Sequence, residues 1–238
     1  MVNKIYKFVP FDGTELDEKK LTTLINSSIW IANVDSLNDS EEFKKLIVKE
    51  DVDPLFDVYV WNELVQEFRK EYGVCSFSLC DYKSKKMWKK YGKDGNGFLM
   101  EIIVIGDLVK PVKYQNRSIP VNKILADIKA NLRVDYNGKI YSSDPVCREK
   151  VEDLKRLFYI KETKWKTEKE YRIVYPIDDS IGKNVRLSDI GLKLGRIIAG
   201  YSCNKSMLNR LSQISHDLDI SELYVANRIA DKIEIKSM

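Results

Sequence analysis

Hydrophobic and polar positions along the chain follow two periods, which predict short strands interleaved with helices. The longest apolar run, G-F-L-M-E-I-I-V-I at Gly97–Ile105, is nearly continuous, as is typical of a strand buried on both faces. Alternating or short apolar runs bounded by turn-forming residues predict further strands at Lys4–Val9, Ser28–Ala32, Val74–Leu79, Glu170–Pro176, Arg196–Gly200, Glu222–Ala226 and Lys232–Lys236.

Apolar residues at helical spacing predict amphipathic helices between these strands. In the first, over Thr14–Asn26, the residues expected to face the core are Leu16, Leu21, Leu24 and Ile25. Further helices are predicted at Pro54–Gly73, Ser84–Gly92, Val121–Arg133, Val146–Tyr159 and Lys205–His216. Helices and strands alternate irregularly, and hairpin-like neighbours close the chain. The pattern therefore predicts a single α+β domain over residues 1–238, with a mixed, largely antiparallel sheet.

Composition fits a folded domain without a strong preference for polyanions. The 238 residues are 44% hydrophobic, and 40 Lys and Arg against 36 Asp and Glu give a net charge of +4, so nucleic-acid binding would need a local patch. A single histidine, His216, and the lack of a C-x-x-C pair leave no usual zinc site. Four separated cysteines fit a reducing cytosol, and no run of about 18 apolar residues occurs. We expect a cytoplasmic protein without a membrane span.

Two glutamates and an arginine stand at the entrance of a late predicted strand. On an extended segment Glu168, Glu170 and Arg172 share one side, so two carboxylates and a guanidinium lie next to each other. Such a row is either a chemical site or a solvent-facing ladder of charge pairs, and the ladder is the commoner outcome. Lys161 and Trp165 precede the row. Trp165 is either a wall for a ring-shaped ligand or a core residue.

A lysine-rich segment, Lys83–Lys93, contains three large apolar side chains. On a helix Met87, Trp88 and Tyr91 share one stripe, while the lysines spread over the opposite arc. This is the pattern of an ordinary solvated helix. The alternative is a patch that follows phosphates, with Trp88 or Tyr91 as a stacking platform.

Two shorter segments carry further candidate residues. Asn38, Asp39 and Glu42 follow a predicted strand, where they either cap the next helix or supply oxygen ligands to a cation such as magnesium. Tyr6 and Lys7 lie in the first predicted strand. Lys7 either anchors a phosphate, pairs with Glu170 if the two strands are neighbours, or simply blunts an edge.

Four sequence blocks in a fixed order resemble one known family. They are I-Y-K-F at Ile5–Phe8, I-W-I-A-N-V-D-S-L-N-D at Ile29–Asp39, M-W-K-K-Y-G-K-D-G-N-G-F at Met87–Phe98 and K-x-x-x-W-x-x-E-x-E-Y-R at Lys161–Arg172. Together they resemble the bacterial and phage family called domain of unknown function 2971, over most of residues 5–201. Leu37 and Ser40 depart from the family's pattern, which has phenylalanine and proline there. Because the family's activity is not settled, the resemblance implies co-occurring blocks rather than a mechanism.

The order of the elements is also similar to that of ADP-ribosyltransferase-like folds. These folds have an N-terminal strand with a basic or aromatic pair, a second strand ending in a small polar turn, and a late strand opened by E-x-E. The similarity implies that Glu170 is the catalytic carboxylate and that Glu168 positions the acceptor. It also implies that Tyr6 and Lys7 contact a dinucleotide.

The favoured functional hypothesis is an NAD-dependent ADP-ribosyltransferase-like or NAD-cleaving enzyme of a phage-defence or phage-encoded system, because charged rows are costly to desolvate unless they are used. The catalytic candidates are Glu170, Glu168 and Arg172. The candidates for binding NAD are Tyr6, Lys7, Asn38, Asp39, Trp88, Tyr91 and Trp165. One alternative is a nucleic-acid or nucleotide-binding module without turnover that uses the Lys83–Lys93 helix. Another is a metal-dependent nuclease built on Asp39, Glu42, Glu168 and Glu170.

Overall fold

The structure, a computed structural model, describes residues 2–34, 71–116, 155–177, 181–220 and 222–238, together with four strands of two residues. These short strands pair with each other, β3 (Leu46–Ile47) with β8 (Ile119–Pro120) and β9 (Arg133–Val134) with β10 (Ile140–Tyr141). No helix in the described part of the chain is both long and apolar enough to cross a membrane.

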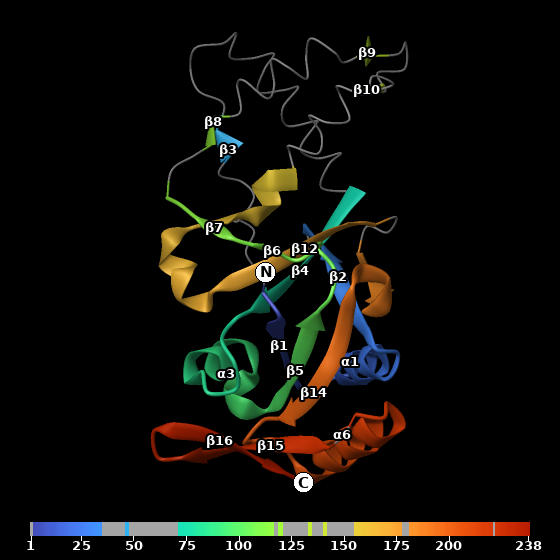
Figure 1. The fold of residues 1–238 in the computed structure, drawn as a ribbon, viewed down its shortest axis with the longest axis vertical. Helices are drawn as coiled ribbons and strands as arrows, with labels where there is room; N and C mark the ends of the chain where they lie inside the picture. The colour runs from blue at the N-terminus through green and yellow to red at the C-terminus, as the bar shows by residue number, and fades with distance from the viewer. Residues whose placement is uncertain are drawn as a thin grey trace.

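A ten-stranded sheet organises the described residues (Figure 1). Its main order is β13-β2-β4-β1-β5-β14-β15-β16, with β12 also paired to β4, and β6 paired to β12. Within this sheet only the pair β14–β15 is parallel. The bounds are β1 Lys4–Pro10, β2 Ser28–Asn33, β4 Tyr72–Ser78, β5 Gly97–Val104, β6 Lys110–Pro111, β12 Glu170–Pro176, β13 Gly182–Arg186, β14 Leu192–Ala199, β15 Leu223–Ile229 and β16 Lys232–Ser237. The predicted α+β class with a mixed, largely antiparallel sheet is confirmed.

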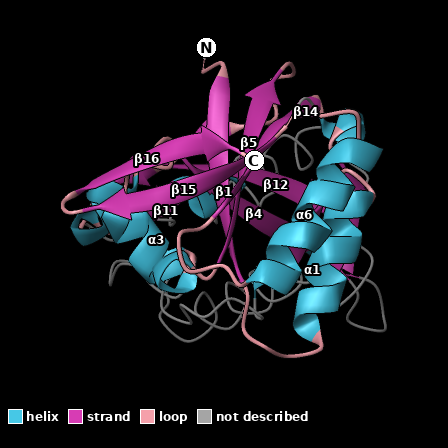
Figure 2. Ribbon diagram, turned by 90° about the horizontal axis from the view of Figure 1, so that it is seen from below, coloured by secondary structure: helices cyan, strands magenta, loops and turns pink. Residues whose placement is uncertain are grey.

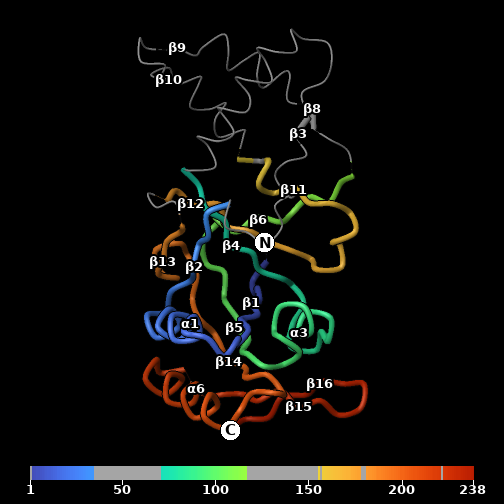
Figure 3. The backbone as a smooth tube through the Cα atoms, turned by 180° about the vertical axis from the view of Figure 1, so that it is seen from behind, coloured from blue at the N-terminus to red at the C-terminus, as the bar shows by residue number. Residues whose placement is uncertain are grey.

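Helices cover both faces of this sheet. The helices α1 (Leu16–Ile25) and α6 (Lys205–Asp217) lie side by side (Figure 2), where Leu21, Leu24 and Leu211 join the larger core. The helix α3 (Lys85–Tyr91) lies across the strands from α1 (Figure 3). Its Met87 and Trp88 form a second core with residues of β1, β5, β14, β15 and β16. One side of the sheet therefore faces α1 and α6, and the other faces α3.

The sheet forks at β4. The strand β12 pairs with β4 along its whole length, from Glu170 opposite Ser78 to Pro176 opposite Tyr72, and so occupies one edge. The opposite edge is shared by two strands, because β1 joins it at Ser78 and β2 joins it at Val74 and Gly73. Between these two points neither strand pairs with β4, and the ammonium of Lys7 donates to the carbonyl oxygen of Ser76 at 3.1 Å.

Two of the four residues expected to face the core from the first helix do so. Leu21 and Leu24 are buried, whereas Leu16 and Ile25 are 53% and 49% exposed. The reason is Asp17, which is 2% exposed and accepts hydrogen bonds from the backbone N–H groups of residues 12 and 13. Its inward position, one helical turn before Leu21, rotates the flanking apolar residues toward solvent.

Other elements differ from prediction in ways that propensity does not anticipate. β13 was not predicted, because its sequence G-K-N-V-R has little apolar alternation and depends on pairing with β2. Gly73 lies in β4 rather than at the end of a helix. The predicted helices at Pro54–Gly73 and Val121–Arg133 fall almost entirely outside the described residues, and so does most of Val146–Tyr159, whose last four residues form a 3-10 helix, η3 (Arg156–Tyr159).

Candidate functional site

A row of polar side chains crosses the sheet on the face that also carries α3. Its register pairs Glu170 with Ser78, Ser78 with Tyr6, Tyr6 with Glu101, and Glu101 with Arg196. Residues directly opposite each other on neighbouring strands point to the same face, with Cβ atoms about 5 Å apart. The row therefore joins β12, β4, β1, β5 and β14, and it brings Tyr6 and Glu170 to the same side of the sheet.

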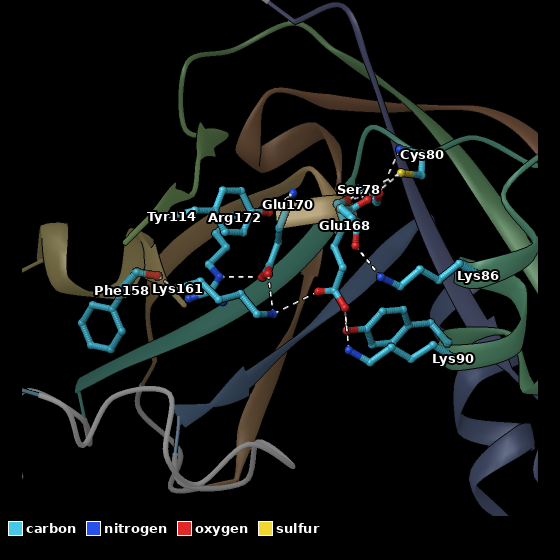
Figure 4. A network of polar contacts seen from close by, with 12 residues as sticks. Ser78, Cys80, Lys86, Lys90, Tyr114, Phe158, Lys161, Glu168, Glu170 and Arg172 are labelled. Carbon is cyan, nitrogen blue, oxygen red and sulfur yellow. Dashed lines mark hydrogen bonds and ion pairs between the residues drawn. The ribbon is translucent and has the colours of Figure 1, made fainter. Parts of the chain in front are cut away.

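Two buried carboxylates meet at the β12 end of the row (Figure 4). Lys161 closes the short strand β11 (Ile160–Lys161), and its Nζ lies 2.7 Å from Oε2 of Glu170 and 3.2 Å from Oε2 of Glu168. Nε of Arg172 donates to Oε1 of Glu170 at 2.6 Å, and its Nη1 donates to the carbonyl oxygen of Phe158 at 2.6 Å. The backbone N–H of Glu170 donates to the hydroxyl oxygen of Tyr114 at 2.7 Å.

The turn at Lys169 places Glu168 beside Glu170. Glu168 ends η4 (Thr163–Glu168), a 3-10 helix, and Lys169 adopts a left-handed conformation with φ 47° before β12 begins. The hydroxyl of Ser78 donates to the carbonyl oxygen of Glu168 at 2.5 Å and holds this turn against β4. The turn and the alternation of β12 together direct both carboxylates to Lys161.

The solvent-facing ladder is the wrong interpretation of this row. Glu168, Glu170 and Arg172 are only 2%, 5% and 1% exposed. Burial by itself raises the pKa of the Glu170 carboxyl, but the charges of Arg172 and Lys161 and their hydrogen bonds lower it to about 2. The pKa of Glu168 is also lowered, against the effect of its burial, by Lys90, Lys161 and Tyr91. Both carboxyl groups are therefore ionised at neutral pH.

The helix α3 reaches the carboxylates from the other side. Nζ of Lys90 and the hydroxyl of Tyr91 both donate to Oε1 of Glu168, at 2.5 and 2.8 Å, and Lys86 donates to the hydroxyl of Thr167. Nζ of Lys90 also lies 3.6 Å from the centre of the Trp165 ring. We call Glu168, Glu170, Lys161, Arg172 and Lys90 the Glu168–Glu170 cluster. Its three cations against two carboxylates leave one positive charge in excess.

The candidate cofactor residues do not all meet at this cluster. Tyr91 contacts Glu168 and Trp165 contacts Lys90, so both border the cluster, and Tyr6 lies two strands away in the row. Lys7 alternates to the other face, where its ammonium binds the Ser76 carbonyl and lies 5.6 Å from the Phe77 ring centre. Trp88 is 0% exposed, and its indole N–H donates to the carbonyl oxygen of Tyr82. A stacking role for Trp88 is therefore wrong.

Asn38, Asp39 and Glu42 lie outside the described residues. Within the described residues no group of three or more His, Cys, Asp or Glu is arranged to hold a metal ion. The ammonium of Lys161 occupies the position between Glu168 and Glu170 that a divalent cation would take. Cys75, Cys80 and Cys203 carry free thiols.

Sequence reasoning missed a second buried carboxylate, at the other end of the row. Glu101 is 3% exposed and binds Arg196 and Lys4. One signal was available, because Glu101 is the only charged residue in the apolar run of β5. The contribution of Tyr114 had no signal in the sequence, since it depends on a contact between segments 56 residues apart.

Comparisons of the chain with protein-family models, curated proteins and solved structures find no match. The resemblance to the domain of unknown function 2971 family and the single-domain organisation therefore stay predictions.

Proposed function

We propose that the chain is a nucleotide-binding module whose ligand lies against Trp165 and the lysines of α3 and η4. The observation that carries this proposal is the contact of Lys90 with both Trp165 and Glu168. It places a cation, an aromatic ring and a buried carboxylate in one continuous arrangement. A ligand that combines an aromatic base with phosphate groups matches this set of side chains.

Three ammonium groups lie near the indole, each paired with at least one carboxylate: Lys90 with Glu168, Lys161 with Glu168 and Glu170, and Lys164 with Glu162. Besides Lys90, the ammonium groups of Lys161 and Lys164 lie 5.6 and 5.3 Å from the ring centre of Trp165. Trp165 is partly exposed, and the Lys90 side chain is 34% exposed. An anionic group that approaches the ring therefore meets positive charge without first opening the core.

The two glutamates serve this site as a scaffold. Oε1 of Glu170 accepts from Arg172 and its Oε2 from Lys161, so each oxygen already has a cationic partner. Oε1 of Glu168 holds Lys90 and Tyr91 in place. Carboxylates used in this way orient the cations, and ionised groups of low pKa are poor proton acceptors near neutral pH. This arrangement favours binding over turnover.

Binding can be tested by calorimetry on the full chain with NAD, ATP and short single-stranded DNA and RNA, at 50 and 200 mM salt. Base stacking on an aromatic side chain contributes about 1–3 kcal/mol, so Trp165→Leu should weaken binding roughly 5- to 150-fold. Lys90→Met should weaken binding and reduce its dependence on salt. The matched control is Lys19→Met, which changes an exposed lysine of α1.

Two results would refute the nucleotide site. One is that no member of the ligand panel binds at either salt concentration. The other is that a ligand binds but Trp165→Leu and Lys90→Met bind it as tightly as the wild type does. Binding that weakens equally in Lys19→Met would assign the effect to general charge rather than to this site.

A second candidate is cleavage of NAD at its glycosidic bond. The low pKa of Glu170 favours it, because a carboxylate that stays ionised can stabilise an oxocarbenium-like ribose. The test is nicotinamide release from NAD by the wild type and by Glu170→Gln. Release that Glu170→Gln abolishes in a folded protein would support the enzyme. No release with any acceptor would leave binding without turnover.

A further inference from the structure

A second charged group lies at the far end of the polar row, on β1, β5 and β14. Nε and Nη2 of Arg196 donate to Oε1 and Oε2 of Glu101 at 3.2 and 2.6 Å, and Nζ of Lys4 donates to Oε1 at 3.0 Å. We call Glu101, Arg196 and Lys4 the Glu101 cluster. The strands that carry it are adjacent in the centre of the sheet (Figure 1).

A β-bulge in β14 builds this cluster. Leu194 pairs with Ile102, but the next pair is Arg196 with Glu101, so Gly195 is an extra residue in the strand. Without the bulge Arg196 would stand opposite Met100, whose side chain belongs to the core under α1 and α6. The extra residue moves the guanidinium to the opposite face and aims it at Glu101. Gly195 suits this position, because a Cβ there would lie 3.3 Å from the carbonyl oxygen of Glu101.

Stability alone does not account for a carboxylate at residue 101. Its side chain is 4% exposed on a strand that is otherwise apolar, and an apolar residue there would extend the core formed by Phe8 and Leu99. Replacing a buried ion pair by packed apolar side chains is often neutral or stabilising. We therefore explain Glu101 by its partners: it holds the side chains of Arg196 and Lys4, which extend outward to the surface.

The two cations keep donors for another partner. The side chains of Arg196 and Lys4 are 31% and 51% exposed, although the carboxylate between them is buried. A guanidinium has five N–H donors and an ammonium has three. Glu101 takes two from Arg196 and one from Lys4, and Arg196 also hydrogen-bonds the side chain of Tyr224, so both cations keep further donors. Tyr6, opposite Glu101, and Tyr224, whose ring centre lies 5.3 Å from the Arg196 guanidinium, are partly exposed beside them.

We propose that Arg196 and Lys4 form a binding site for a doubly charged oxyanion of the phosphate type. Two cations against one carboxylate leave a net positive charge, and the forked donors of arginine match the oxygens of a phosphate. A phosphate bridges the guanidinium and the ammonium on the outer side of Glu101. The site is separate from the nucleotide site at Trp165 and does not depend on it.

The experiment is a titration of the wild-type protein with inorganic phosphate, followed by the NMR signal of the Arg196 Nε–H group and assigned with Arg196→Lys. A saturable shift that chloride at the same ionic strength does not produce is the expected result. Arg210 is the internal control, because it forms a similar two-pronged pair with Glu18 at the surface, but that carboxylate is 61% exposed and lacks a bound lysine among the described residues.

Each remaining outcome bears on the proposal. Lys4→Met should raise the dissociation constant for phosphate about tenfold or more, and an unchanged constant would overturn a two-cation site. Equal, unsaturable shifts at Arg196 and Arg210 would show an adventitious ion only. Saturation by acetate at the same concentrations as phosphate would overturn the preference for a doubly charged oxyanion.

Discussion

Lys161 holds two buried negative charges together, so its replacement should expose the energetic role of the Glu168–Glu170 cluster. Lys161→Met keeps an unbranched side chain of similar length and removes the ammonium that lies 2.7 Å from Glu170 and 3.2 Å from Glu168. The two carboxylates then face each other without the cation between them. Arg172 still binds Glu170, and Lys90 still binds Glu168.

The expected loss is large for a single substitution. Removing one partner of a buried ion pair costs about 3–5 kcal/mol, because an uncompensated charge stays buried. Two carboxylates lose a partner here, although each keeps one cation, so we expect a loss near the lower end of that range. Like charges at close range raise the pKa values of a carboxylate pair, and protonation of one member relieves the repulsion. The loss should therefore shrink as the pH falls from 7 toward 4.

Urea unfolding at pH 7, 5.5 and 4 measures both effects, with the free energy of unfolding taken from the midpoint and the slope. The matched control is Lys164→Met, whose ammonium pairs with Glu162 at the surface, where its side chain is 63% exposed. Surface pairs contribute about 0–1 kcal/mol, so this variant should unfold almost as the wild type does. A loss below about 1 kcal/mol in Lys161→Met, or a loss that does not change with pH, would refute the reasoning.

Three further predictions follow from the burial of individual side chains. The pKa of Glu170 falls to about 2 in the folded state from an ordinary value near 4.5. Its ionisation should therefore stabilise the fold by roughly 3 kcal/mol above pH 5, and this stabilisation should be lost as the pH falls toward 2. Urea unfolding across this range should show a steeper loss in the wild type than in Glu170→Gln. Trp88→Ala should cost about 3–5 kcal/mol, whereas Trp165→Ala should cost much less, as thermal unfolding of the two variants will show. Asp17→Ala should cost about 1–3 kcal/mol in urea unfolding, because two backbone N–H groups lose their acceptor.

The strands were the best predicted part of the fold, and the reasons are local. Glu170–Pro176 was predicted with the bounds of β12, because its residues alternate and a charged segment and Pro176 bound the run. Gly97–Ile105 differs from β5 by one residue, because this run is nearly continuously apolar and begins at a glycine. The rotation of α1 was not predictable in this way. It depends on hydrogen bonds of Asp17 to a preceding loop, which helical periodicity does not contain.

The candidate site was predicted in part. Alternation along the strand correctly placed Glu170 and Arg172 on one side. Glu168 was expected on the same extended segment, but it ends the 3-10 helix η4 and reaches Lys161 through the turn at Lys169. Alternation carries no information on burial, which comes from α3 and η4 folding over this face. The Glu101 cluster needed a register shift in β14, and a bulge of one residue leaves almost no trace in a single sequence.

The fork at β4 interrupts the strand pairing inside the sheet, because β1 and β2 pair with β4 at separate points on the same edge. Between the points where β1 and β2 pair with β4, neither strand offers a backbone donor to Ser76 on this edge. The ammonium of Lys7 donates to the Ser76 carbonyl oxygen instead. A flexible lysine can leave that carbonyl to water without breaking any strand pairing. β4 alone thus joins the part of the sheet with β2 and β13 to the part with β1, β5 and β14. The larger core, which contains Ile31 of β2 and Ile5 of β1, spans this gap and holds the two parts together.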